Sequence, residues 1–86
     1  MPESPVEQLL SQRLGTHIAR LRVERHLSQE ALAQRVGIST NHLQLLESGL
    51  SDRTKRSPAN PRLSTLVALS DALDVPLTEL LAESSK

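Results

Sequence analysis

Residues 29–48 read QEALAQRVGISTNHLQLLES, and this stretch decides the fold. Ser28 precedes a first predicted helix over residues 29–36, and Gly37 follows it. Ser39 precedes a second predicted helix over residues 40–48. Serine is a common N-cap and glycine a common left-handed stop. A connection this short suits two helices that cross near a right angle.

The small and apolar residues of this stretch fit such a crossing. Ala33 leaves room where the two helices meet, and Gly37 tolerates the sharp turn because it has no Cβ. We expect an inward-facing apolar set of Leu32, Val36, Ile38, Leu43 and Leu46. The second helix then turns outward four uncharged side chains that donate, accept or contact a methyl group: Thr40, Asn41, Gln44 and Leu45.

A longer helix is predicted before this stretch. Ser4 and Glu7 form a capping box with a proline at the first helical position, and the helix ends near Arg25. Gly15 interrupts it at a cost of about 1 kcal/mol, so the helix is either continuous or bent there. Its apolar positions recur at helical spacing: Val6, Leu9, Leu10, Leu14, Ile18 and Leu21.

The segments after the crossing are predicted from their loop-favouring and helix-capping residues. Residues 50–61 are rich in Ser, Thr, Asn, Asp and Pro, which favour a loop without strands. Ser64 is predicted to cap a helix that ends at Asp74, and residues 77–82 form a last short helix. The whole forms one domain over residues 5–82, with a basic loop at 50–62 and flexible ends at 1–4 and 83–86.

Composition limits the possible functions. The chain has 86 residues, no Cys and no Phe, Tyr or Trp, which excludes disulfides, Cys-based zinc sites and aromatic platforms for single strands. No apolar run approaches the roughly 18 residues of a membrane span, and no signal peptide is recognisable, so we expect a soluble cytoplasmic protein. Net charge is zero, yet residues 1–62 carry nine Lys or Arg against six acids.

These features together resemble the phage repressor and Cro-like (XRE-type) helix-turn-helix family. The resemblance covers about residues 14–82 and rests on the twenty-residue spacing above with its flanking helices. The matching stretches are LRVER at 21–25, LSQEALA at 27–33, VGIS at 36–39, LESG at 46–49 and residues 63–81. It implies an all-α fold, a compact five-helix bundle of the lambda/434 repressor-like type, with its third helix in the DNA major groove.

Site residues follow from this resemblance by position. The base-facing residues are Thr40, Asn41, Gln44 and Leu45, with Asn41 suited to adenine and Leu45 to a thymine methyl group. Gln29 is expected to contact phosphate and to brace the third helix. The other expected contacts to the DNA backbone are Ser28, Ser39, His42, Ser48, Arg53, Lys55, Arg56 and Arg62. A structural role is expected for Ala33, Gly37 and the interhelical ion pair of Arg22 with Glu47.

The sequence also departs from the family pattern. His26 and Asp74 stand where the family usually has glycine, although both residue types can adopt a left-handed turn. The loop after Gly49 is longer than the family's usual form, and Arg53, Lys55 and Arg56 lie in the added stretch. These cations either contact phosphate or form a solvated loop. His42 likewise either contacts phosphate or is a solvated surface side chain.

The expected function is a sequence-specific double-stranded-DNA-binding regulator, a repressor rather than an activator. A palindromic operator requires a two-fold protein, so we expect a homodimer through the last helix, the N-terminal helix, or both. The alternative is a protein-interaction module such as an antitoxin. No nucleophile–base pair, carboxylate dyad or phosphate-cradling loop indicates an enzyme, and the scattered His17, His26 and His42 predict no metal or other cofactor.

Overall fold

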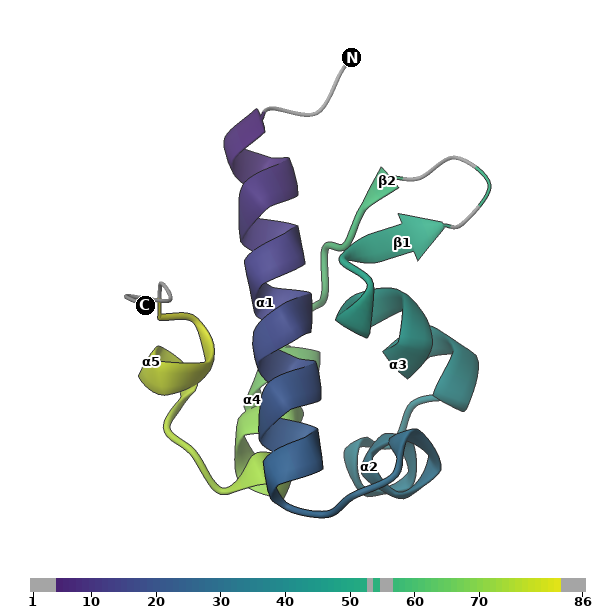
Figure 1. Cartoon of the computed structure of the whole chain (residues 1–86), viewed down its shortest axis with the longest axis vertical. Coiled ribbons are helices and arrows are strands. Elements are labelled where there is room, and N and C mark those ends of the chain that lie inside the picture. The colour runs from purple at the N-terminus through teal and green to yellow at the C-terminus, as the bar shows by residue number, and fades with distance from the viewer. Residues whose placement is uncertain (1–4, 53, 55–56, 83–86) are drawn as a thin grey trace.

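The computed structural model describes residues 5–52, 54 and 57–82. Five helices form a bundle around one apolar core, and a two-stranded hairpin lies beside them (Figure 1). The helices and strands are, in chain order, α1 (Pro5–Glu24), α2 (Gln29–Val36), α3 (Thr40–Glu47), β1 (Leu50–Asp52), β2 (Ser57–Pro58), α4 (Leu63–Leu73) and α5 (Leu77–Leu80). The five-helix bundle predicted from the sequence is confirmed. The predictions for residues 1–4 and 83–86, including the Ser4 cap, lie outside the described residues.

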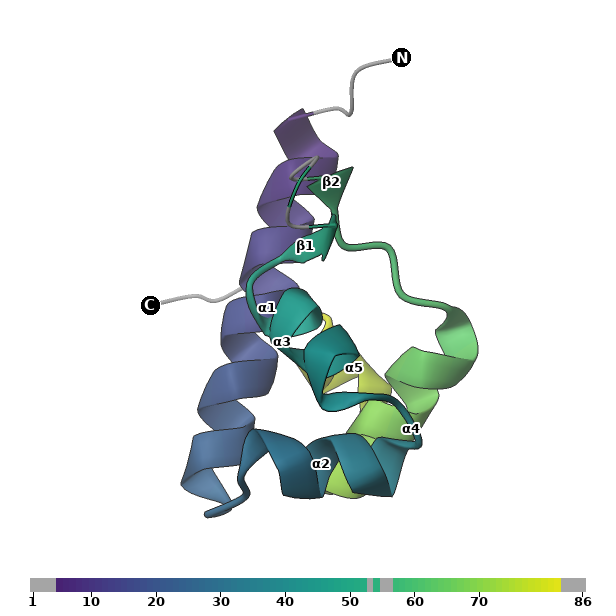
Figure 2. The same cartoon turned by 90° about the vertical axis from the view of Figure 1, so that its right-hand side faces the viewer.

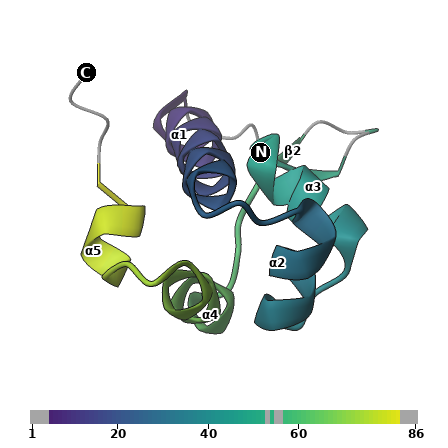
Figure 3. The same ribbon diagram turned by 60° about the horizontal axis from the view of Figure 1, so that its bottom comes forward.

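Aliphatic side chains from all five helices form the core. Its largest fully buried members are Ile18, Leu32, Leu43, Leu69, Leu73 and Leu80. Of the five residues predicted to face inward, Leu32, Leu43 and Leu46 are buried, whereas Val36 and Ile38 are half-buried against the same cluster. Figure 3 shows α2 and α3 on one side of α1, with α4 and α5 beneath it.

Helix α1 runs through Gly15 without interruption. A Cβ at this position would collide with the carbonyl oxygen of Leu46 and lie 2.7 Å from that of Glu47. Gly15 therefore lets the backbones of α1 and α3 approach closely, which the sequence pattern did not predict. The predicted apolar face of α1 is buried only in its second half, because Val6, Leu9 and Leu10 are exposed.

Two helices end at a residue that replaces the glycine usual in the family. His26 after α1 and Asp74 after α4 have φ angles of 57° and 58°. Both are therefore left-handed, as expected for residues that replace a C-terminal glycine. Each tolerates the conformation less well than glycine does.

Three local predictions were wrong. The loop after Gly49 contains an antiparallel hairpin, in which Leu50 pairs with Pro58 and Asp52 with Ser57, with an irregular register between the pairs. Helix α4 begins two residues earlier than predicted, and its N-cap is Arg62 without a side-chain cap bond, so Ser64 is not the cap. The last helix is a single turn that ends at Leu80.

Candidate nucleic-acid interface

The turn between α2 and α3 is built by its caps. The hydroxyl oxygen of Ser28 accepts a hydrogen bond from the Ala31 amide, and that of Ser39 accepts one from the His42 amide, both at 3.0 Å. Gly37 ends α2 with a φ of 86°, and nothing lies within 4 Å of a Cβ added there. Its role is therefore conformational. Ala33 is buried at the crossing, as predicted, and Figure 2 shows α3 crossing above α2.

Three of the four predicted base-facing residues lie outside the buried core of α3. Asn41 is exposed, and Thr40 and Leu45 are half-buried. Leu43 and Leu46 enter the core on either side of Leu45, which does not belong to the core cluster. Adjacent leucines point in different directions because successive residues of a helix are about 100° apart. This face therefore presents an amide, a hydroxyl and a methyl-bearing side chain together.

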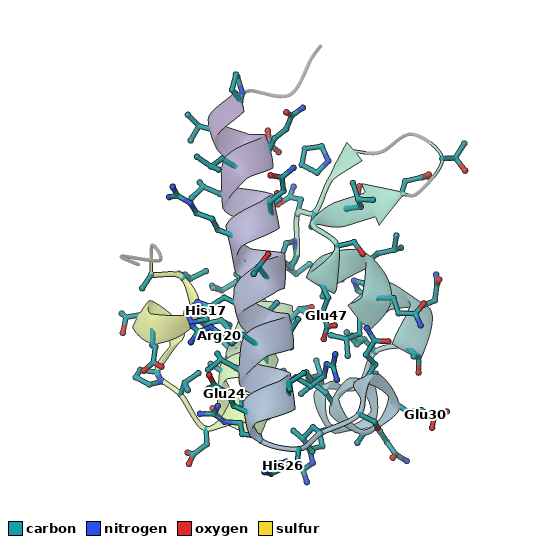
Figure 4. The ribbon with its side chains drawn as sticks, in the orientation of Figure 1. His17, Arg20, Glu24, His26, Glu30 and Glu47 are labelled. Carbon is teal, nitrogen blue, oxygen red and sulfur yellow. The ribbon has the colours of Figure 1, made fainter. Side chains whose placement is uncertain are left out.

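A polar network connects α1, α2 and α3 behind this face. The guanidinium of Arg22 donates to the Glu47 carboxylate from Nε at 2.7 Å and from Nη2 at 3.2 Å, and Nη1 donates to the Leu27 carbonyl at 2.8 Å. The Glu47 side chain is only 7 % exposed, and in Figure 4 it points into the space between α1 and α3. The predicted ion pair is confirmed, with the forked geometry that arginine and a carboxylate favour.

The network continues from Glu47 to the start of α2. Gln29 Nε2 donates to Glu47 Oε1 at 2.9 Å, and Gln44 Nε2 donates to Gln29 Oε1 at 3.4 Å. The predicted bracing of α3 by Gln29 is therefore present. Because Glu47 accepts from one N–H and Gln44 donates to the oxygen, the amide of Gln29 has one defined orientation, with a second N–H remaining on Nε2.

Gln44 differs from the other predicted base-facing residues. Its side chain is half-buried and its amide turns toward Gln29. The sequence pattern could not show this, because Gln29 and Gln44 lie on two different helices, and their separation is set only by the way the helices cross. Base contact by Gln44 stays a prediction, and its observed bond is to another side chain of the protein.

Five of the residues predicted to contact the DNA backbone are described and exposed. Ser28, Ser39 and His42 are exposed near the N-terminal ends of α2 and α3, while Ser48 and Arg62 are exposed near the ends of α3 and α4. Arg53, Lys55 and Arg56 lie outside the described residues. Contact of these five side chains with the DNA backbone stays a prediction.

One buried hydroxyl was not predicted from the sequence. Ser11 in α1 is 5 % exposed, and its Oγ donates to the Ala59 carbonyl at 2.8 Å. The signal was the recurrence of small residues at 11 and 15 on the helical stripe that continues to Ile18. Small residues at such spacing permit the close approach of another backbone.

The described residues were also compared with what a metal site or a membrane span requires. They contain no group of three or more His, Cys, Asp or Glu placed to hold a metal ion, and His17 and His26 lie well apart on α1 and its end (Figure 4). Nor does any helix in the described ranges have the length and apolar character to cross a membrane.

Comparison with known proteins identifies the family. The helix-turn-helix family model matches residues 18–80, which is more than half of the chain. The chain therefore belongs to the helix-turn-helix family, of the XRE type expected from the sequence. Curated protein sequences give no significant match.

Solved structures agree with this assignment. The restriction-modification controller protein C.AhdI from Aeromonas hydrophila is 29 % identical with a TM-score of 0.66, covering 80 % of this chain and 92 % of its own. The N-terminal DNA binding domain of SinR from Bacillus subtilis is 28 % identical with a TM-score of 0.69, covering 87 % and 99 %. The hypothetical transcription factor NHTF from Neisseria is 31 % identical with a TM-score of 0.70, covering 94 % and 82 %.

Proposed function

We propose that this DNA-binding transcriptional regulator reads a specific double-stranded sequence by placing α3 in the major groove. The observation that supports this most directly is the outward face of α3, where Thr40, Asn41 and Leu45 lie together while Leu43 and Leu46 anchor the helix in the core. Asn41 is suited to adenine and Leu45 to a thymine methyl group. Gln44 is proposed to assist from the edge of the same face.

Backbone contacts position the helix. Gln29 offers its remaining amide N–H to a phosphate, and Ser28, Ser39, His42 and Ser48 add hydrogen bonds around α3. Arg62 and the loop cations Arg53, Lys55 and Arg56 supply positive charge. The basic excess of residues 1–62 supports this distribution of roles.

A homodimer is proposed as the binding species. The exposed apolar residues at the ends of the chain support it: Val6, Leu9 and Leu10 on α1, and Leu81 after α5. Leu80 is fully buried in the core and is not available for such a contact. A two-fold dimer reads a palindrome with half-sites about 34 Å apart. Sedimentation that shows only monomer at high micromolar concentration, with and without DNA, would contradict the dimer.

Repression through occupancy of an operator in the cytoplasm is the simplest mode of action for this domain. A protein bound to the operator blocks RNA polymerase by its presence alone, whereas an activator needs a further surface that contacts the polymerase. The proposal requires no metal or cofactor.

Selection of duplexes from a random pool tests the proposal. The expected result is a recurring sequence with two half-sites separated by about one helical turn. If no duplex outcompetes bulk genomic DNA, the protein does not read sequence and the proposal is wrong.

A further inference from the structure

The first half of α1 and the segment between α3 and α4 pack against each other. Residues 5–17 of α1 precede the family match, which begins at residue 18. The β1–β2 hairpin lies between α3 and α4, in the loop that the sequence comparison with the family pattern predicts to be longer than usual. The Ser11 hydroxyl connects the two segments by donating to the Ala59 carbonyl directly after β2, and both residues are buried.

The start of β1, at the base of the hairpin, also lies close to α1. Gly49, directly before β1, has a φ of 76°, and a Cβ on it would lie 3.0 Å from the Gln12 Cα. The Ala59 amide donates to the Gly49 carbonyl at 2.9 Å, which joins the two ends of the hairpin. The N-terminal half of α1 therefore contacts the base of both strands and fixes their position.

This position leaves a hollow between the hairpin and α3. The hollow has a volume of about 80 Å³ and its floor is apolar, with Leu46, Leu50 and Pro61. Its polar lining consists of His42 from α3, Ser51 from β1 and Asn60 after β2, all of which are exposed. Figure 2 shows the hairpin above α3.

The lining of the hollow suits a phosphodiester group. Hydroxyl, amide and imidazole groups commonly donate to phosphate oxygens of DNA, and none of the residues that line the hollow is acidic. The nearby carboxylate of Asp52 accepts a hydrogen bond from the Thr54 amide at 2.8 Å and is not among the lining groups. The hollow adjoins α3 at its side, and with α3 in the major groove, as proposed above, the backbone of the duplex would pass there.

We propose that the first half of α1 acts as a brace that holds the β1–β2 hairpin beside α3, so that Ser51, Asn60 and His42 bind one phosphodiester of the bound duplex. The inference rests on the proposed function, because it needs α3 in the major groove. Ser51 and Asn60 are the new DNA-contacting residues, and Ser11 is a positioning residue that acts through the hairpin.

The chain offers a matched control for Ser11. Ser70 in α4 is also 5 % exposed, and its Oγ donates to the Val67 carbonyl at 2.7 Å, within its own helix and away from the hairpin. Ser11→Ala and Ser70→Ala each remove one buried hydroxyl bonded to a backbone carbonyl. Both variants should lose similar stability in thermal melts.

Only Ser11→Ala should weaken DNA binding. On the duplex selected by the wild-type protein, we expect its dissociation constant to rise about tenfold, whereas Ser70→Ala stays close to the wild type. Equal dissociation constants for the two folded variants would overturn the brace. A wild-type protein that selects no duplex would instead overturn the proposed function, so the two failures are distinguishable.

The phosphate site is tested separately at the surface, where folding is not at risk. Ethylation of single phosphates in the selected duplex maps those that the wild-type protein needs. With Asn60→Ala or Ser51→Ala, we expect one phosphate to lose its interference signal while the selected base sequence is unchanged. An unchanged interference map in both variants would refute the site, as would a loss of signal at the same phosphate in Ser70→Ala.

Discussion

Replacing Gly15 by alanine tests whether the contact between α1 and α3 or the helix propensity of α1 has the larger effect on the free energy of unfolding. In an isolated helix this change is stabilising, because alanine is the better helix former by about 0.8–1.0 kcal/mol. In this fold the new methyl group meets backbone: it would collide with the Leu46 carbonyl oxygen and lie 2.7 Å from the Glu47 carbonyl oxygen. The two effects have opposite signs, so the sign of the measured change decides which dominates.

The magnitude follows from what the methyl group meets. Overpacking a core costs about 1–3 kcal/mol, with the low end where flexible side chains can move. Carbonyl groups at the C-terminal end of α3 cannot move without shifting the helix, so we take about 3 kcal/mol as the penalty. Subtracting the gain in propensity leaves a net destabilisation of about 2 kcal/mol. For a domain of this size, this lowers the melting temperature by about 8–16 °C.

Thermal and urea denaturation measure the change. Thr16→Ala is the control, because Thr16 is the exposed neighbour of Gly15 on α1 and its replacement changes helix propensity at an exposed position. We expect Thr16→Ala to match or exceed wild-type stability and Gly15→Ala to fall well below it. A Gly15→Ala protein that melts at or above the wild-type temperature would refute the close contact between α1 and α3.

Three further predictions concern the polar network and DNA binding. Glu47→Ala should destabilise the fold by about 3–5 kcal/mol, because it leaves the half-buried Arg22 guanidinium without its carboxylate. Glu30→Ala at the exposed surface of α2 is the control, and equal melting temperatures would reject the role of the pair. Asn41→Ala should relax selection at one base position by about 1–3 kcal/mol while the others persist; an unchanged selected sequence contradicts base contact. Replacing Arg53, Lys55 and Arg56 together by alanine should make the slope of log affinity against log salt less steep by about 0.9 for every phosphate that they neutralise. An unchanged slope would show that these three cations do not contact phosphate.

Local sequence signals predicted several features that depend only on residues a few positions apart in the chain. The caps Ser28 and Ser39 and the left-handed Gly37 depend on residues within four positions, and these three were predicted correctly, unlike the Ser64 cap. His26 and Asp74 adopted the expected left-handed turns for the same reason. The ion pair of Arg22 with Glu47 spans 25 positions, yet it was predictable because the family resemblance supplied the long-range geometry.

Other features had no local signal strong enough to decide them. The Gln44 amide faces outward on a helical wheel, but the crossing of α2 and α3 brings Gln29 within hydrogen-bonding distance of it. The short strands of the hairpin contain Ser, Asp and Pro, which individually disfavour strands. Their pairing is supported instead by the hydrogen bond from Ser11 of α1 to the Ala59 carbonyl and by the close approach of Gly49 to Gln12 of α1.

The order of polar and apolar residues, together with the caps and glycines, determined the five helices, the crossing of α2 and α3 and the outward set on α3. Periodicity and capping act over one or two turns, so they can be read along the chain. Tertiary structure alone decided that Gly15 is a contact point, that Gln44 turns toward Gln29 and that the hairpin rests on the first half of α1. Each of these depends on how closely two backbones approach, and that distance is set only when all the helices share one core.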